Sequence, residues 1–565
     1  MDIPKGMSWN CRNILSSLFC CVLCAVHGTV TASDTVYVSG AVQHDGLLEW
    51  DPKWYYGSNS YLDLSVHYLN DSNRCHFKGL RATTRLEMMQ WPLPGYDEDF
   101  AGHGVGHLSV AATFDFGEFT VGDVYAQFGA GLILNLYEDR YLGIDGALRG
   151  AKIDLQPYKG IDLTLIGGKQ RRFWNCYTDH AWGWNYTQDA VLGADLELHV
   201  DQWSRRMQEL DMSLLIGASY VSKYEQFDSV YVMRDDGQYI YNLPLWVGAG
   251  DVRVNWQYKG WDLLVEYANK ANDPSDENGY SYMPGEAFLA SLSYSRKGLA
   301  VLAQIKRSYN MAFRSSRKCI SLTGLEGRIN LLPVFGKQHT YALPSLNQYA
   351  TQYANGEWAF QTELRYTWAR KTRMGGRYGT TLALSAAHIR GLKEPGSWDV
   401  SPRSEGEYFT DINLELNKRL SKRWWLNAML MYQAANFNVI EGEGGFMRAG
   451  IAVVEGRFRL NDNIGMRGEL QYLYSPDYEG QWIFALYELS LYQCVSLSGE
   501  WMYNIGHAPL AANEHFYNVS ATYTNGAHRL QLGYCKTKDG YNCAGGVCRY
   551  VPQQKGITLS YNFTW

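Results

Sequence analysis

Charged side chains of both signs gather with glycines in one stretch of this 565-residue chain, where they could contact a polar solute. Gly129 and Gly131 permit a bend that other residues would resist. Two interpretations are open: a segment folded inward as a constriction or substrate contact, or a solvated hairpin tip. The candidates for a constriction are Asp123, Glu138, Asp139, Arg140, Asp145 and Arg149.

Two other groupings have the residue types of a metal site. His103 and His107 are four apart, a spacing that puts two ligands on one face of a helix, but the glycines between them argue against a helix. The oxygen ligands of residues 273–279 could hold calcium in a tight turn, but the full twelve-residue pattern and its distal Glu are missing. We expect ordinary loops at both places, and no metal or cofactor.

Catalysis would need a Ser with a His, or an Asp and His pair, gathered at one point. Asp97, Asp99 and His103 are close in sequence, but there is no Gly-x-Ser-x-Gly motif. We therefore expect no enzyme, with a hydrolase as the remaining catalytic possibility.

The last strand indicates what kind of structure carries these residues. The chain ends on residues 555–565, whose apolar side chains alternate with polar ones, as in a strand with one face on lipid. Such a strand would be a sticky edge in a soluble β-sandwich, the alternative fold, but it is a closing strand in a membrane barrel. The end resembles the aromatic signal read by the barrel-insertion machinery, which implies that role for Tyr561, Phe563 and Trp565.

Short and long connections alternate along the chain. Tight turns are expected at 116–118, 157–160, 258–260, 296–298, 420–423, 461–463 and 524–527, the last of them an Asn-Gly turn. The fold predicted is all-β: a large antiparallel transmembrane β-barrel of about 24 strands, within a window of roughly 18 to 26, filling residues 33–565 as one domain. The stretch 309–357 is too long for a plain loop and could contain another hairpin around residues 328–336.

The alternation of apolar and polar residues also predicts which side chains face lipid and which face the lumen. Leu364 and Tyr366 would face lipid and leave Glu363 and Arg365 inside, and Ile412 and Leu414 would face out between inward polar residues. Arg457 and Glu469 join the inward candidates. Mixed charges inside allow a water-filled channel or a lumen crossed by ion pairs and filled by a loop. Because a barrel of this size would be wide, we expect a partial plug.

The start of the chain predicts export. Lys5 and Arg12 precede an apolar run from Ile14 to Val26, and small residues follow up to Ala32, as in a cleaved signal peptide over residues 1–32. The chain is mildly acidic, with a formal charge of -6, so nothing favours nucleic acid as a partner. Aromatic residues make up 14% of the chain, which suits the girdles of a barrel.

Of the 11 cysteines, those after the leader are Cys75, Cys176, Cys319, Cys494, Cys535, Cys543 and Cys548. Export permits disulfides, and an odd number leaves at least one thiol unpaired. We expect a bridge within a loop between two of Cys535, Cys543 and Cys548.

Two patterns carry a family resemblance: Gly-Asp-x-Tyr-x-Gln-Phe-Gly-x-Gly-Leu over residues 122–132, and Glu-Asp-Arg-x-Leu-Gly-Ile-Asp over 138–145. In them the chain resembles an uncharacterised family of outer-membrane β-barrels of the Bacteroidetes. The resemblance implies the bacterial outer membrane, with its lipid as a partner, and barrel architecture. It implies no activity and no ligand.

Two functions remain open. The first is a porin-like or gated channel for small polar solutes. The second is a structural or assembly barrel with a closed lumen, which binds a surface lipoprotein or polysaccharide through its long outer loops. Nothing in the sequence names the solute or the partner.

Overall fold

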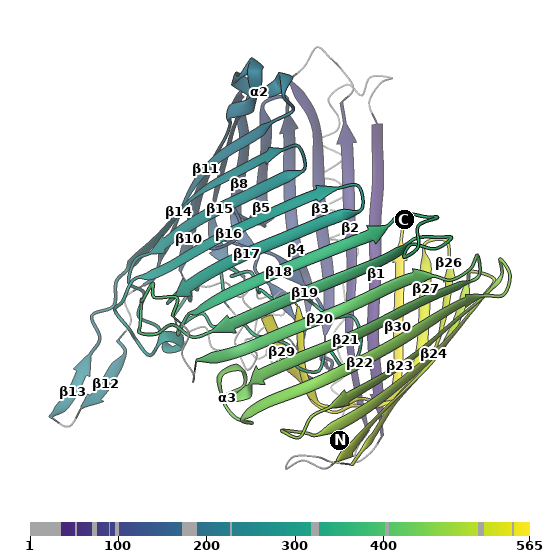
Figure 1. Cartoon of the computed structure of the whole chain (residues 1–565). Helices are drawn as coiled ribbons and strands as arrows, with labels where there is room; N and C mark the ends of the chain where they lie inside the picture. Colours follow the sequence, from purple (N-terminus) through teal and green to yellow (C-terminus); the bar gives the residue numbers. More distant parts are fainter. Residues whose placement is uncertain are drawn as a thin grey trace, which may run out of the picture.

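The computed structural model describes residues 35–50, 54–70, 76–89, 91–96, 101–171, 189–226, 229–234, 236–317, 327–401, 406–506, 513–544 and 547–565. These residues form one closed antiparallel sheet of 24 strands in which neighbours in sequence are neighbours in space. β1 pairs with β2 on one side and with β30 on the other, which closes the barrel (Figure 1).

The barrel strands are β1 (Thr35–Glu49), β2 (Tyr55–Leu69), β3 (Phe77–Met89), β4 (Gly102–Phe114), β5 (Gly117–Val124), β8 (Leu148–Tyr158), β9 (Ile161–Gln170), β10 (Ala190–His199), β11 (Ser213–Tyr224), β14 (Trp246–Tyr258), β15 (Trp261–Lys270), β16 (Gly285–Arg296), β17 (Leu299–Tyr309), β18 (Glu357–Trp368), β19 (Thr380–Arg390), β20 (Glu407–Arg419), β21 (Trp424–Asn436), β22 (Phe446–Arg459), β23 (Ile464–Tyr474), β24 (Gln481–Leu491), β25 (Val495–Gly506), β26 (His515–Asn525), β27 (His528–Lys536) and β30 (Lys555–Thr564).

The remaining elements are short. Three strand pairs lie in connections: β6 (Glu138–Asp139) with β7 (Ile144–Asp145), β12 (Tyr231–Arg234) with β13 (Gly237–Ile240), and β28 (Gly540–Ala544) with β29 (Val547–Val551). The helices are η2 (Val200–Trp203), α2 (Arg205–Glu209), η3 (Asp276–Asn278) and α3 (Phe437–Ile440). Among the described residues, no helix is long and apolar enough to cross a membrane.

The predicted barrel and its strand number are confirmed, and the alternation that predicted them has a physical cause. Leu430 on β21 and Leu470 on β23 are 64% and 56% exposed, whereas Gln433 and Gln471 on the same strands are 1% exposed. In a closed barrel the exposed apolar row meets lipid, where an Arg or Lys would cost about 2–4 kcal/mol at mid-depth. Polar residues therefore alternate onto the inner face.

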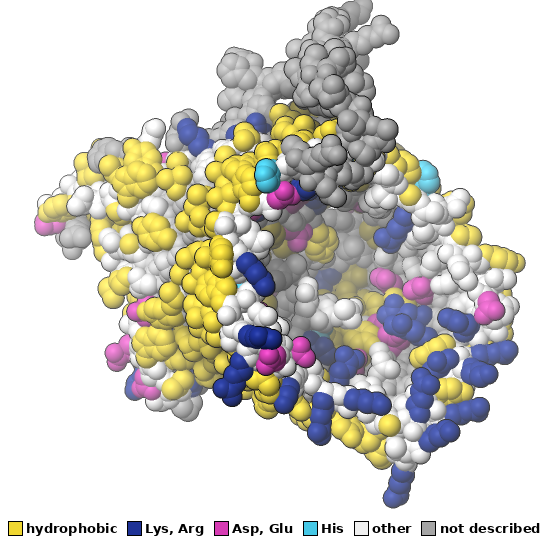
Figure 2. Space-filling view, turned by 90° about the horizontal axis from the view of Figure 1, so that it is seen from above, with side chains coloured by type: hydrophobic (Ala, Val, Ile, Leu, Met, Phe, Trp, Pro, Cys, Tyr) yellow, Lys and Arg dark blue, Asp and Glu magenta, His cyan; other side chains and the backbone are white. Residues whose placement is uncertain are grey.

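The two rims of the barrel differ. The short-turn rim carries tight connections such as those from Phe114 to Gly117 and from Asn525 to His528. Seen from this rim, the interior is hollowed and bears charges of both signs, and Lys and Arg side chains gather along one arc (Figure 2). Exposed cations on the β18–β23 part of this rim are Arg370, Lys371, Arg373, Arg377, Lys422, Arg423 and Arg459.

The long-connection rim carries two segments that turn into the barrel. We call residues 125–147 the first inner segment, and residues 310–356 the second inner segment, of which 318–326 are not described. The expected hairpin around 328–336 is wrong for the described residues, which show no strand there and only an isolated bridge between Arg314 and Arg328. The backbone bonds instead to the other inner segment, with Asn135 donating to Ile329 and Leu331 donating to Gly131.

Candidate functional site: a lumen closed by two inner segments

The first inner segment is fixed by arginine–carboxylate pairs. Arg85 on β3 lies 2.5 Å from Glu138 and 2.7 Å from Asp145, and 2.6 Å from Glu87 on its own strand. Arg171, at the end of β9, pairs with both Glu87 and Asp145. Since breaking a buried pair leaves an uncompensated charge, this network holds the segment against the wall.

Arg140 continues the network to the opposite side of the segment. Its guanidinium lies 2.6 Å from Glu138 and 2.8 Å from Asp63 on β2, and 4.4 Å above the ring of Tyr61. Burial lowers the pKa of Arg140 but Glu138 and Asp63 raise it, and the net shift is upward, so the charge is permanent. Sequence reasoning missed Asp63 and Glu87, whose only signal is their inward position on strands with period two.

Two other charged candidates, Asp123 on β5 and Asp139 on β6, accept hydrogen bonds from backbone N–H groups. Asp123, 1% exposed, accepts from Arg149 Nε at 2.6 Å and from the backbone N–H of Leu108 at 2.7 Å. The carboxylate of Asp139 accepts from the N–H of Leu142 and so shapes the turn within the segment. These side chains are occupied by partners of the same chain.

Gly129 explains how the segment approaches the wall. Its φ is 51°, and a Cβ there would come within 2.7 Å of the Glu266 carboxylate. Glu266 on β15 accepts from the N–H of the next residue, Ala130, at 2.8 Å. A glycine is therefore required both for the left-handed backbone and for the close contact.

The second inner segment forms an apolar core with the first one. Phe313, Ile329, Leu332 and Leu343 are each 0% exposed, as are residues Leu132, Ile133 and Leu134 of the first segment. Asn330 ties the two together, since its amide donates to the carbonyl groups of Leu132 at 3.0 Å and Met311 at 2.8 Å. The lumen at this level is packed like the interior of a soluble protein.

Polar groups of the wall hold the second segment along β20–β23. His339 lies 2.6 Å from Asp411, the hydroxyl of Tyr341 donates to Glu455 at 3.0 Å, and the N–H of Leu343 donates to Gln471 at 2.8 Å. The inward residues of these strands thus accept hydrogen bonds from a chain segment at this depth.

One outer connection clasps the second segment. Glu277, in η3 between β15 and β16, lies 2.7 Å from Arg314 and 2.9 Å from Arg328. Burial alone would raise the pKa of the Glu277 carboxyl. The two arginines lower this pKa by more than burial raises it, and the net value is about 2. Asp273 nearby lies 2.8 Å from Lys223, so two of the carboxylates that could have bound calcium, Asp273 and Glu277, are paired with cations.

Buried cations inside the wall were also missed. Lys306 on β17 pairs with Glu357 on β18 at 2.7 Å, both with fully buried side chains, and Lys270 donates to the carbonyl of Ala312 at 2.6 Å. The sequence indicates only that each lysine faces inward, near the end of its strand that leads into a long connection. The second inner segment buries them, and its sequence has no regular alternation of polar and apolar residues from which this could be predicted.

The other lumen candidates lie nearer the short-turn rim. Glu469 is 6% exposed and lies 2.6 Å from Arg467, whereas the side chain of Arg457 is 59% exposed and pairs with Glu455. Arg457 and Arg467 line a cavity of about 480 Å³. Glu363 accepts from Gln361 at 2.9 Å, and Arg365 on the same strand is exposed.

Two larger cavities meet at the Glu138–Arg140 ion pair. A cavity of about 600 Å³, lined by Glu138, reaches toward the short-turn rim along β1–β5. A cavity of about 760 Å³, lined by Arg140, opens between the wall and the outer connections on the other side. Glu138 and Arg140 together line a third, small pocket of about 30 Å³. The ion pair therefore separates two polar spaces.

The aromatic residues of the closing strand and the described cysteines Cys535 and Cys548 do not line these two cavities. Tyr561 bonds to His528 on β27 at 2.9 Å, the ring of Phe563 stacks on the same histidine at 4.2 Å, and Trp565 is 45% exposed beside Gly40. Cys548 is disulfide-bonded and stands opposite Cys543 across the β28–β29 hairpin, whereas Cys535 is a free, buried thiol.

The histidine pair resembling a metal site is in a strand, not a helix. His107 on β4 stacks on Tyr125 at 5.8 Å and bonds to Ser109 at 3.0 Å. Among the described residues, one other group has metal-ligand geometry, namely Asp162, Glu197 and His199, with ligand atoms within 4.8 Å. His199 already bonds to Asp162 and Arg253 already pairs with Glu197, so these groups satisfy one another.

One family model matches nearly the whole chain. The model of DUF6029, a family of unknown function, matches residues 14–565. No curated protein is similar enough in sequence to count as a relative. The closed antiparallel barrel of 24 strands lies within the size range of outer-membrane barrels.

Three solved structures illustrate the likeness. The copper transporter OprC is 11% identical with a TM-score of 0.41, over 95% of this chain and 82% of that one. The siderophore receptor PirA from Pseudomonas aeruginosa is 10% identical with a TM-score of 0.39, over 95% and 82%. OccAB3 from Acinetobacter baumannii is 8% identical with a TM-score of 0.35, over 95% and 100%.

Proposed function

The chain belongs to the DUF6029 family, and we propose that it is a gated outer-membrane channel for small polar solutes. Residues 138–145 of the first inner segment are the gate, and the Glu138–Arg140 pair is its narrowest point. The supporting observation is the pair of polar cavities, about 760 and 600 Å³, that meet at this ion pair. Cavities of this size hold small-molecule ligands in other proteins.

The chemistry of the junction suits a gate for polar solutes. A lumen lined with carboxylates, guanidinium groups and amides offers hydrogen bonds in place of those a solute loses from water. Arg140 makes its ion pairs with Glu138 of the same segment and with Asp63 of the wall. A shift of this one side chain would join the cavities without moving the apolar core.

Single-channel recording in planar lipid bilayers tests this proposal. Arg140→Ala removes the side chain that separates the cavities, while Glu138 keeps its pair with Arg85. We expect rare, small openings of the unaltered protein and a larger, more frequent conductance of the variant. Arg457→Ala is the matched control, because Arg457 is also a lumenal arginine paired with a carboxylate but lies outside the junction. No conductance in either protein, with both folded, would contradict a channel.

The closed-lumen alternative is favoured by a different observation. Lys306 and Glu357 have fully buried side chains, as a permanent plug would produce. A barrel of that kind would bind a surface lipoprotein or polysaccharide through its long connections. Crosslinking followed by affinity capture separates the two, since a stoichiometric partner is expected only for this alternative.

We further propose that residues 1–32 are a cleaved leader, that the protein comes from the Bacteroidetes, and that it is not an enzyme. Tyr561, Phe563 and Trp565 would be read by the barrel-insertion machinery, and outer-membrane lipid would contact the outer face. Mass determination of the mature N-terminus tests the leader directly.

A further inference from the structure

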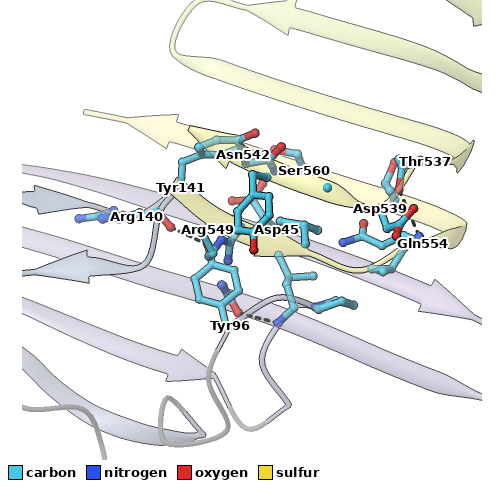
Figure 3. A pocket seen from close by; sticks show the side chains of 18 of the residues that line it. Asp45, Tyr96, Arg140, Tyr141, Thr537, Asp539, Asn542, Arg549, Gln554 and Ser560 are labelled. Atoms are coloured by element: carbon cyan, nitrogen blue, oxygen red, sulfur yellow. Dashed lines mark hydrogen bonds between the residues drawn. The ribbon is translucent and has the colours of Figure 1, made fainter. Parts of the chain in front are cut away.

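The cavity of about 760 Å³ has walls of several kinds. The barrel strands β1, β2, β27 and β30 form one side, and the β28–β29 hairpin and Tyr141 of the first inner segment face it. Figure 3 shows Tyr96, Arg140, Tyr141, Asn542 and Arg549 around this space. The space lies at the long-connection end, so a solute from that side would meet it before the Glu138–Arg140 pair.

Four tyrosines line this cavity, and they differ in what covers their rings. The ring of Tyr61 lies under Arg140 at 4.4 Å, and that of Tyr96 lies under Arg549 at 3.9 Å. Tyr141 and Tyr541 are 58% and 41% exposed, although they belong to a lumenal segment and a hairpin and not to the lipid face. Exposed ring faces offer flat, apolar contact surfaces. The C–H face of a sugar ring is a matching surface.

The polar groups of the cavity are rich in amides and spare acceptors. Gln43, Gln348, Gln531, Asn542 and Gln554 all line it. Asp45 and Asp539 have no ion-pair cation among the described residues; one accepts from Gln43 at 2.8 Å and the other from Tyr550 at 3.0 Å. A carboxylate has about four acceptor sites, so both can accept further hydrogen bonds. Ligand hydroxyl groups would donate to them.

Arg549 on β29 is the unusual cation. It is 5% exposed, and its Nε and Nη1 have no hydrogen-bond partner among the described residues. Arg85, Arg140 and Arg171 each pair with carboxylates, whereas no carboxylate of the described chain pairs with Arg549. The ring of Tyr96 covers one face of this guanidinium, but two buried donors without an acceptor are costly, and a bidentate carboxylate is the partner that a guanidinium fits best.

We propose that this cavity binds a saccharide that carries a carboxylate, of the uronic-acid class. The carboxylate pairs with Arg549, the hydroxyl groups bond to the amides and to Asp45 and Asp539, and the sugar rings stack on Tyr141 and Tyr541. Binding stands on the cavity alone. The step from binding to transport rests on the proposed channel function.

Calorimetry on the purified full chain in detergent tests the ligand class. The probes are trigalacturonate, maltotriose and tricarballylate, which respectively have sugar rings with carboxylates, sugar rings alone, and carboxylates alone. We expect trigalacturonate to bind at least about tenfold tighter than maltotriose, because charge-assisted pairs are the stronger ones, and tricarballylate not to bind. Equal affinity for maltotriose, equal affinity for tricarballylate, or no binding by trigalacturonate would each overturn the proposal.

Variants assign the roles of the side chains. Arg549→Gln should weaken trigalacturonate at least about tenfold and leave maltotriose unchanged, and Arg549→Lys should keep part of the difference. Tyr541→Ala should weaken both sugars. Arg423→Gln, on the short-turn rim, and Tyr239→Ala, on the β12–β13 hairpin, are matched controls outside the cavity. An unchanged melting transition shows that each variant is folded, and equal effects of variants and controls would overturn the assignment.

Failure here and failure of the channel proposal can be told apart. Trigalacturonate bound by a protein without conductance would support the cavity site and contradict the channel. Conductance without binding of trigalacturonate would support the channel and contradict the cavity site. If both hold, trigalacturonate should reduce the ion current through Arg140→Ala, and maltotriose should reduce it less.

Discussion

Residues 138–145 of the first inner segment are fixed to the wall by ion pairs, whereas the second inner segment is packed into an apolar core, which it shares with Leu132, Ile133 and Leu134, and is bonded by wall residues along β20–β23. Glu138, Arg140 and Asp145 hold the first segment through Arg85, Asp63 and Arg171. Phe313, Leu332 and Leu343 of the second are each 0% exposed. Ion pairs can exchange partners one at a time, but a close-packed core loses its contacts together. Residues 138–145 of the first segment are therefore the part that can move.

The strongest test of this difference removes apolar volume from the second segment. Phe313→Ala should lower the free energy of unfolding by about 3–5 kcal/mol, because the buried ring leaves a cavity that the barrel wall cannot close. Urea titration of the protein in lipid vesicles, followed by tryptophan fluorescence, measures the loss.

A matched control uses a phenylalanine on the short-turn rim. Phe116 is 44% exposed, so Phe116→Ala should change the free energy of unfolding by less than about 0.5 kcal/mol. Equal losses in the two variants would mean that packing inside the lumen adds no more stability than an exposed ring on the rim.

Much of the wall could be predicted from sequence, because lipid and lumen impose opposite demands on successive residues. Ile412 is 43% exposed and Asp411 is 1% exposed, as period two requires. The inner segments carry no such period. The length of 309–357 and the charges around Arg140 signalled something unusual, but partners such as Asp63 depend on which wall strands a segment meets.

A smaller effect is expected at the clasp on the second segment. Glu277→Gln removes the charge that pairs with Arg314 and Arg328 but keeps the shape, and hydrogen bonds to charged groups contribute about 1.5–3 kcal/mol. The variant should be destabilised by an amount in this range at pH 7. Urea titration measures it, and a loss as large as that of Phe313→Ala would contradict the contrast between charges and packing.

The pH dependence of the clasp follows from the same group. The pKa of the Glu277 carboxyl is lowered from 4.5 to about 2, so its contribution is complete above pH 4.5 and is lost as the pH falls through about 2. Wild-type stability should decline in that window more steeply than that of Glu277→Gln. If the two proteins decline in parallel between pH 4.5 and pH 2, the carboxylate does not stabilise the clasp.

The smallest change in stability is expected for a solvent-exposed arginine whose carboxylate partner bonds to the second inner segment. Arg457 pairs with Glu455, which also accepts from the hydroxyl of Tyr341, but the Arg457 side chain is 59% exposed. Exposed pairs contribute about 0–1 kcal/mol because water screens them, so Arg457→Ala should barely change the unfolding midpoint in urea. Glu455→Gln should cost more, since Glu455 is 3% exposed and serves both partners. If the two variants lower the stability equally, the arginine has a structural role that its exposure does not explain. Ion pairs would then stabilise the second inner segment as much as apolar packing does.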